Sequence, residues 1–209
     1  MSLAVRLALL GLVAAAALFA VAGVVLAGML GYLGGSTTVH PKGNYSVSEA
    51  RSYAGFPVFY PGESIGGHQL TAVARDPLGP MRKNQESVEF MYGTCEIPAG
   101  MDGGCSLPVS VSNEPACSRN LSMYNGLLSP KAGRTRVRGT TAAFFEGGSR
   151  LEIQTGTTTV VIFAFSKQKA LSVAESLRGV NVPVSAHDPL PPPARGAVEG
   201  SLGCPRKLR

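Results

Sequence analysis

The chain has 209 residues, a net charge of +6 and only 15% charged residues. Its length accommodates one ordinary domain with additional segments, and its hydrophobic content of 44% excludes a disordered protein. The positive charge is spread over the start, the middle and the tail of the chain, whereas a nucleic-acid-binding domain gathers basic and aromatic residues on one face, so we expect no nucleic-acid partner.

The first feature along the chain is an apolar run of 27 residues, Leu7–Leu33, which predicts a membrane anchor. A hydrocarbon core of about 30 Å needs about 20 helical residues, so this run can span a bilayer with some tilt. A cleaved signal peptide ending near Ala22 is the alternative. We favour an uncleaved signal anchor, because the apolar run continues well beyond Ala22. Arg6 precedes the run, which predicts a cytoplasmic N-terminus and an extracytoplasmic bulk.

Once the anchor is placed, the whole chain can be divided into predicted parts. The predicted parts are a cytoplasmic stub at 1–6, the signal anchor at 7–33, a tether at 34–43, an extracytoplasmic α+β domain at 44–182 and a Pro/Gly-rich tail at 183–209. We expect the tail to be extended and flexible, and to be pinned only if Cys204 is bonded.

The first half of the domain carries one helix signal and several strand signals. Ser46 or Ser48 can cap a short helix at 49–53, and Glu49 follows Ser46 by three positions, which is the spacing of a capping box. Short strands are expected at 57–61 and 70–75. Residues 87–92 alternate in polarity, so their apolar side chains should share one face of a strand. Pro108 interrupts the next alternating run and indicates an edge strand or the start of a strand.

The second half predicts a meander of three strands joined by glycine turns. The strands are expected at 141–146, 150–155 and 157–165. In the middle strand, alternation places Glu152 and Gln154 on a face that points to water.

A helix and the fold class follow from the remaining pattern. Ser166 can cap a helix that ends near Gly179, with small apolar residues along one stripe. Strands at this spacing with few helices indicate an α+β fold. We expect an N-terminal transmembrane helix followed by an antiparallel sheet that is packed by one or two helices and stapled by disulfides.

The four cysteines all follow the apolar run and predict disulfides. Their number is even and they show no C-x-x-C spacing, which favours an oxidising compartment over a zinc or redox site. Four cysteines allow three pairings. We favour Cys95–Cys105, across a glycine-rich loop, and Cys117–Cys204, which would hold the tail.

One basic cluster precedes the meander. It comprises Lys131, Arg134, Arg136 and Arg138. The three arginines alternate with other residues, so a strand would present them on one face. The favoured interpretation is a charged solvent-exposed or edge strand. The alternative is a surface for an anionic partner, either lipid headgroups or an acidic cell-envelope polymer.

The G-x-S-x-G string around Ser64 matches the motif of a catalytic serine. A nucleophile elbow would need a helix after the serine, with Asp and His partners from a large α/β scaffold. Here Gly66 and Gly67 and another strand signal follow. The string therefore predicts a plain turn, and a small serine hydrolase remains the minor alternative.

The sequence predicts no metal or cofactor site. His40, His68 and His187 are scattered, and the thiols are expected to be oxidised. No glycine pattern for binding a nucleotide phosphate is present. With no catalytic constellation in view, we expect the protein not to be an enzyme.

The stretch from Arg138-Gly-Thr-Thr-Ala-Ala-Phe-Phe to Ala174-Glu-Ser-Leu177 resembles an uncharacterised domain family of membrane-anchored extracytoplasmic proteins in Gram-positive bacteria. The similarity lies mainly in residues 138–178, and Phe56–Pro61 matches the apolar segment that leads into that domain. The segment Cys95–Cys117 departs from the family pattern. The resemblance implies a folded outer domain without a known catalytic residue.

These observations favour a single-pass, anchored extracytoplasmic module with a binding or scaffold role. A sensor or regulatory domain acting through a membrane protein partner is the alternative. The six-residue stub counts against it, because so short a segment cannot form a signalling module.

Overall fold

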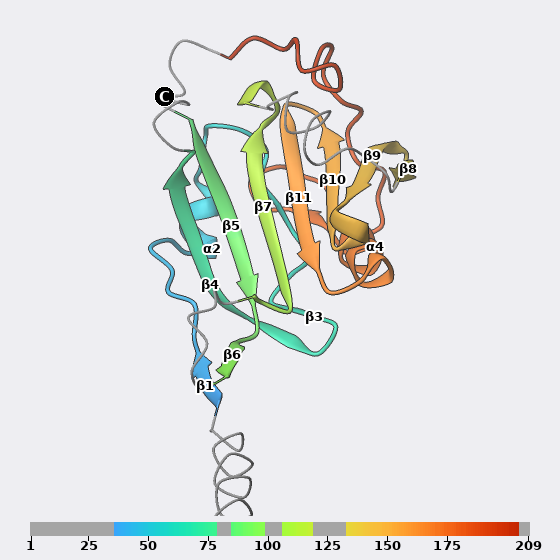
Figure 1. The fold of residues 1–209 in the computed structure, drawn as a ribbon. Helices are drawn as coiled ribbons and strands as arrows, with labels where there is room; N and C mark the ends of the chain where they lie inside the picture. Colours follow the sequence, from blue (N-terminus) through green and yellow to red (C-terminus); the bar gives the residue numbers. More distant parts are fainter. Residues whose placement is uncertain (1–35, 79–84, 99–105, 119–132, 205–209) are drawn as a thin grey trace, which may run out of the picture. The chain divides into compact units, whose positions relative to one another are not determined.

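The computed structural model describes residues 36–78, 85–98, 106–118 and 133–204 (Figure 1). The predicted anchor at 7–33 lies outside these residues. Within the described ranges, no helix is both long and apolar enough to cross a membrane.

The chain divides into two compact units. Most of the two-stranded sheet formed by β1 (Ser36–Val39) and β6 (Cys95–Pro98) belongs to the smaller unit. All the other helices and strands belong to the larger unit, which therefore carries the fold that positions the candidate site.

The larger unit is built on one eight-stranded sheet with the order β3-β4-β5-β7-β11-β10-β9-β8. Its strands are β3 (Ser64–Ile65), β4 (His68–Pro77), β5 (Glu86–Tyr92), β7 (Val109–Pro115), β8 (Arg134–Val137), β9 (Thr140–Phe145), β10 (Arg150–Thr155) and β11 (Thr158–Ala164). Every neighbouring pair is antiparallel. The predicted antiparallel sheet and its terminal meander are confirmed.

In the described part of the chain two α-helices accompany the sheet, α2 (Val47–Arg51) and α4 (Lys167–Glu175). Ser46 caps α2 by accepting the backbone N–H of Glu49, and Ser166 caps α4 by accepting that of Lys169. The Ser166 cap is confirmed, and of the two serines considered for the first helix it is Ser46 and not Ser48 that caps it. Each cap satisfies a backbone donor that a helix start leaves unpaired. The smaller elements are the 3₁₀ turns η2 (Ala116–Ser118) and η3 (Glu146–Gly148) and the paired strands β2 (Phe59–Tyr60) and β12 (Arg178–Gly179).

The core lies on one face of the sheet. Val88, Phe90 and Tyr92 of β5 are fully buried, as their alternation predicts. They belong to the same apolar cluster as the buried alanines of α4 and the segment Phe56–Tyr60. That segment is fixed to the sheet by Asn113 of β7, whose buried amide accepts from the backbone N–H of Phe59 and donates to its carbonyl, at 2.8 and 2.9 Å.

One expectation is wrong for the face of the sheet that points away from the core. Glu152 and Gln154 of β10 were expected to point to water, but only 5% and 1% of their surfaces are exposed. Glu152 forms an ion pair with Arg150, and the hydroxyl of Thr159 donates to Gln154 Oε1 at 2.9 Å. Alternation of polarity could not distinguish these pairs from a solvated face, because mutually bonded polar side chains can also be buried.

The position of Pro108 is also settled. β7 begins immediately after it, at Val109, and lies between β5 and β11 in the interior of the sheet. The strand-start interpretation is therefore confirmed and the edge-strand interpretation is wrong. A proline just before a strand costs no ladder hydrogen bond, which is why an interior strand can begin there.

Candidate functional site

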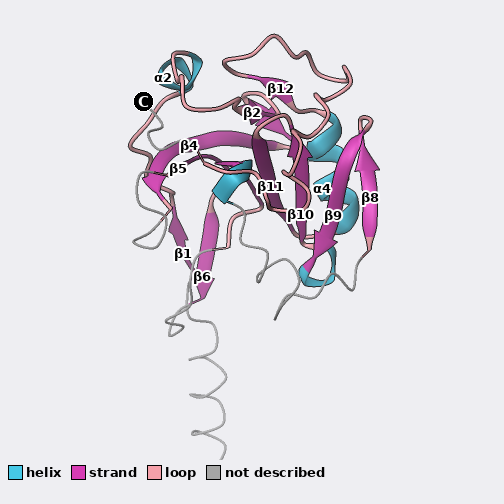
Figure 2. Ribbon diagram, turned by 90° about the horizontal axis from the view of Figure 1, so that it is seen from above, coloured by secondary structure: helices cyan, strands magenta, loops and turns pink. Residues whose placement is uncertain are grey.

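The basic cluster lies on the outermost strand of the sheet. β8 pairs only with β9 among the described strands, and it stands at the end of the sheet order (Figure 2). A two-residue turn, Arg138-Gly139, joins the two strands with φ of +49° and +87°. Two consecutive positive φ values are typical of the hairpin turn that matches the twist of the strands.

Arg134 and Arg136 occupy the same face of β8, and both are exposed, whereas Val137 points to the opposite face and is fully buried. Neither arginine forms an ion pair within the described part of the chain, although Arg136 Nη1 donates to the carbonyl of Gly139 at 3.3 Å. The prediction of a charged edge strand is confirmed for these two residues. Lys131 lies outside the described residues.

Arg138 does not share this face, which corrects the expectation that all three arginines act together. Its half-buried guanidinium donates to the backbone carbonyls of Asp188, Ser185 and Leu177, the first two at 2.6 and 2.8 Å. Burial lowers the pKa of Arg138 from its ordinary value. Arg138 therefore holds the chain after α4 against the hairpin turn and is occupied by that task.

The tail crosses the end of the sheet at which the hairpin turns lie. The Leu190 N–H donates to the carbonyl of Arg138, and the Ala194 N–H donates to that of Gly156 in the β10–β11 turn. The Thr155 hydroxyl donates to the carbonyl of Pro191. Backbone bonds hold the tail before its disulfide is reached, so the expectation that only Cys204 would pin it is wrong.

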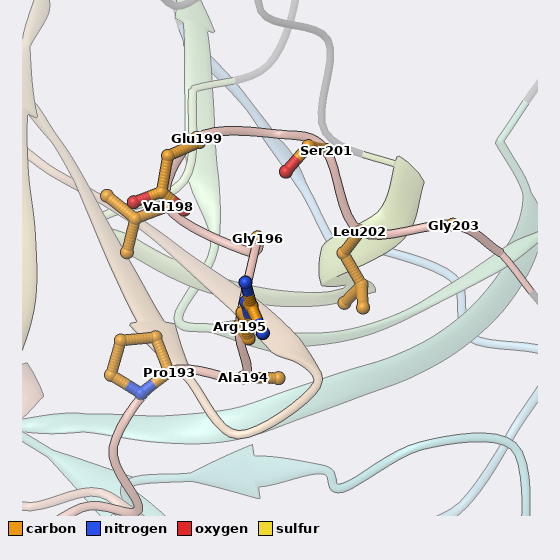
Figure 3. Close-up of a pocket in the computed structure, with 9 residues that line it drawn as sticks. All are labelled: Pro193, Ala194, Arg195, Gly196, Val198, Glu199, Ser201, Leu202 and Gly203. Carbon is orange, nitrogen blue, oxygen red and sulfur yellow. The ribbon is translucent and has the colours of Figure 1, made fainter.

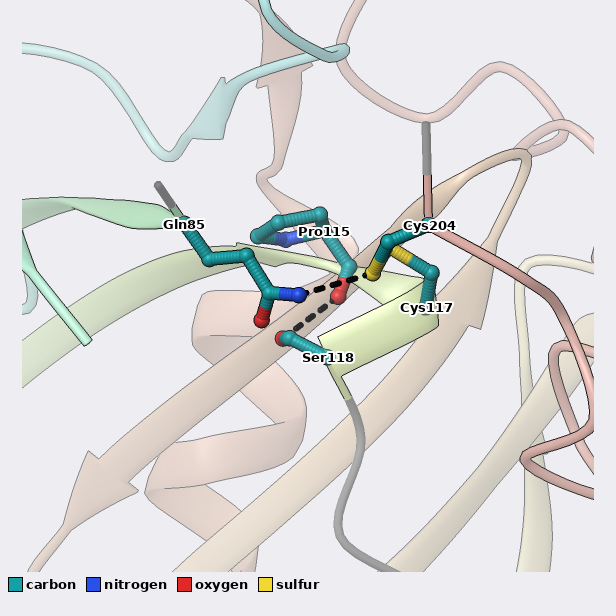
Figure 4. Close-up of a disulfide and its surroundings, with 5 residues drawn as sticks. All are labelled: Gln85, Pro115, Cys117, Ser118 and Cys204. Atoms are coloured by element: carbon teal, nitrogen blue, oxygen red, sulfur yellow. Dashed lines mark hydrogen bonds between the residues drawn. A yellow bond between two sulfur atoms is a disulfide. The ribbon is translucent and has the colours of Figure 1, made fainter. Parts of the chain in front are cut away.

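The Cys117–Cys204 disulfide is confirmed and closes the tail onto the end of β7 (Figure 4). The Gln85 amide donates to Cys204 Sγ at 2.9 Å, and the Ser118 hydroxyl donates to the carbonyl of Pro115. Cys95 is also disulfide-bonded. Its predicted partner Cys105 lies outside the described residues, so that pairing stays a prediction.

Two of the hollows among the described residues lie beside these elements. The first has a volume of about 570 Å³ and is lined by tail residues alone, among them Arg195, Glu199 and Ser201 (Figure 3). The turn that shapes it requires Gly196, whose φ is +83°, and where a Cβ would lie 2.7 Å from the Ser201 hydroxyl. All its walls come from one stretch of chain, so it brings together no groups that are distant in sequence.

The second hollow, of about 560 Å³, lies between α2 and β4. The Arg75 guanidinium lies over the rings of Tyr45 and Tyr53, with 5.7 and 5.0 Å to their centroids, and forms an ion pair with Glu86. Burial and the Glu86 carboxylate raise the pKa of Tyr53 to about 12. The phenol therefore stays protonated at neutral pH and serves as a hydrogen-bonding and stacking group. No periodicity or motif in the sequence marks this cluster of aromatic and charged residues.

Ser64 lies on the short strand β3, whose hairpin partner is β4. Gly66 and Gly67 form the turn, with φ of +54° and +85°, and a strand follows. The string is therefore not the plain Pro-Gly turn that its sequence predicts, because Ser64 belongs to the hairpin of β3 and β4. A strand follows Ser64 where a nucleophile elbow requires a helix. No group of three or more metal-binding side chains occurs in the described ranges.

Comparison of the chain with protein-family models, with curated proteins and with solved structures finds no match.

Proposed function

We propose that this chain is a binding or scaffold module held on the extracytoplasmic side of a cell membrane by the anchor at Leu7–Leu33. The observation that carries the proposal is the Cys117–Cys204 disulfide. It closes a tail that is also hydrogen-bonded across the end of the sheet, so the bridge is integral to the fold. Structural disulfides of this kind persist in oxidising compartments.

The binding role rests on the exposed edge strand. Arg134 and Arg136 are exposed on β8 and form no ion pair with the described residues, so a partner with negative charge would find them accessible. Arg138, by contrast, is committed to the carbonyls of its own chain. The proposed binding residues are therefore two arginines, with the rest of the fold acting as their support.

The location can be tested on the full chain in membranes of the producing cell. Blocking thiols before lysis and counting them after denaturation should reveal none, and protease added to intact spheroplasts should degrade the domain. The Cys204→Ser variant is the control, because it should expose at least one thiol. Free thiols in the parent protein, or protection of the domain from external protease, would contradict the proposal.

A further inference from the structure

The two edges of the eight-stranded sheet are treated differently by the rest of the chain. At the β4 edge, the carbonyl of Val73 accepts from the Tyr45 N–H at 3.1 Å. The Asn44 side chain accepts from the Arg75 N–H and donates to the Arg75 carbonyl, at 2.8 and 3.1 Å. Gly43 makes this approach possible, since a Cβ there would lie 2.3 Å from the Val73 oxygen. This edge is closed.

Among the described residues, no strand or side chain pairs with the outer side of β8. The two-residue turn makes Val137 and Thr140 a hydrogen-bonded pair, so in the antiparallel pattern Arg134 and Arg136 direct their own N–H and C=O groups away from β9. The Phe144 N–H donates to the carbonyl of Gly133, in agreement with that pattern. No hydrogen bond of the described residues reaches the outward groups, and Figure 2 shows no ribbon beyond β8 on its outer side.

We propose that the β8 edge binds an extended acidic peptide segment of a partner protein, which adds to the sheet as a further strand. The inference deepens the proposed function and depends on it for the compartment in which the partner is met. A neighbouring strand supplies both donors and acceptors to the outward N–H and C=O groups of Arg134 and Arg136. Lipid headgroups and acidic polymers lack the regularly spaced row of N–H donors and C=O acceptors that a strand presents.

The side chains define the chemistry of the partner strand. Arg134 and Arg136 share one face and form no ion pair among the described residues. Glu152 lies on the same cross-strand row as Arg134, two strands away, and it already forms an ion pair with Arg150. Carboxylates at alternate positions of an added strand would lie beside the two arginines, where opposite charges stabilise pairing. The recognised pattern is therefore an acidic residue at every second position.

The experiment uses the full-length protein in detergent micelles and a fluorescent, capped heptapeptide of alternating glutamate and valine. We expect the double variant Arg134→Glu, Arg136→Glu to raise the Kd about tenfold or more, because two attractive pairs become repulsive. The variant Arg51→Glu is the matched control, since Arg51 is an exposed arginine on α2, and its Kd should not change. Equal binding by the double variant and the parent would overturn the proposal.

Strand addition is tested separately from charge. Arg136→Gln and Arg136→Pro remove the same charge, but only proline also removes the outward N–H, and the bonds between β8 and β9 do not use that N–H. Arg136→Pro should bind the peptide at least about fivefold more weakly than Arg136→Gln. Should the proline variant fold poorly, a peptide N-methylated at alternate amides tests the same bond on the parent protein.

Two outcomes would replace this proposal. If the methylated peptide binds as tightly as the parent peptide, the edge is a charged surface and not a docking site for a strand. If vesicles of phosphatidylglycerol bind in an arginine-dependent way while the peptide does not, the partner is a lipid surface. Both measurements are made on purified protein, so a negative result leaves the thiol and protease tests of the proposed location standing.

Discussion

At the scale of single residues, side chains of the same type serve different purposes according to where the backbone ends a strand. Arg134 and Arg136 remain on β8 and are exposed, whereas Arg138 enters the turn and bonds to three carbonyls. Three hydrogen bonds from one charged donor to backbone carbonyls stabilise a fold more than an exposed charge does. The structural role of Arg138 can therefore be distinguished by mutation from the surface role of Arg134 and Arg136.

We expect Arg138→Gln to lower the free energy of unfolding by about 2 kcal/mol, because the carbonyls of Leu177, Ser185 and Asp188 lose a charged donor. Arg134→Gln, the matched control, should change it by less than about 0.5 kcal/mol. Urea denaturation of the full chain in detergent, followed by circular dichroism, measures both. Similar losses for the two variants would contradict the assignment.

Glu89 on β5 provides a pH-dependent prediction. Burial raises its pKa, the more so because Asp76 is close, although a hydrogen bond from Ser110 opposes the shift. In the folded protein the carboxyl then binds its proton more tightly than in the unfolded chain. Folding stability should fall as the pH rises from the ordinary pKa of glutamate to the raised one.

Glu89→Gln should remove this dependence, since the amide carries no charge at any pH and keeps a hydrogen-bonding oxygen. The variant should be more stable than the parent at neutral pH, and this advantage should disappear at pH values below the ordinary pKa of glutamate. Denaturation curves from pH 3 to pH 8 measure the difference. Glu49→Gln, at an exposed site on α2, is the control, and an advantage of Glu89→Gln that grew on acidification would show that the sign is wrong.

At the scale of elements, the tail is the segment whose role the structure changes most. Bonds to Arg138, Thr155 and Gly156 make it a strap across the turns of the meander, and Cys204 closes it onto β7. Leu190 and Ala197 are buried, with 4% and 0% of their surfaces exposed. A tail with buried apolar side chains and a covalent closure contributes to the core.

The double variant Cys117→Ser, Cys204→Ser should be less stable than the parent by about 3–4 kcal/mol, because the bridge closes a loop with a sequence separation of 87. We expect limited proteolysis to cut the variant first in the tail. Parent protein and variant are compared by urea denaturation without reductant. An unchanged midpoint would mean that the backbone bonds of the strap suffice without the disulfide.

At the scale of the whole molecule, the larger unit has a complete core that lies between one sheet face and α4 with the segment Phe56–Tyr60. A core of this kind supports folding without the membrane.

Residues 36–209, exported to an oxidising compartment without the predicted anchor, should therefore be soluble and unfold in one cooperative transition. Adding a thiol reductant to the same fragment should lower its melting temperature by more than about 5 °C, because the closure of the strap is lost. Calorimetry measures both. An oxidised fragment that aggregates would indicate that the segment before residue 36 contributes to the fold.

The elements that can be predicted from the sequence alone are those with local signals. Ser46 and Ser166 indicate where the helices start, and glycines indicate the turns of the meander. Alternating polarity identifies the buried face of β5. Capping and periodicity involve residues within a few positions of each other, so they can be read without a fold.

Features that depend on residues distant in the sequence could be established only from the fold. The burial of Glu152 and Gln154, the bonds of Arg138 to the tail, and the closed and open edges of the sheet all follow from which strands lie side by side. A polar residue looks the same in sequence whether its partner is water or another side chain. The candidate site could therefore be predicted as a basic strand. The exposure of Arg134 and Arg136 at the edge of the sheet and the structural role of Arg138 could not be predicted.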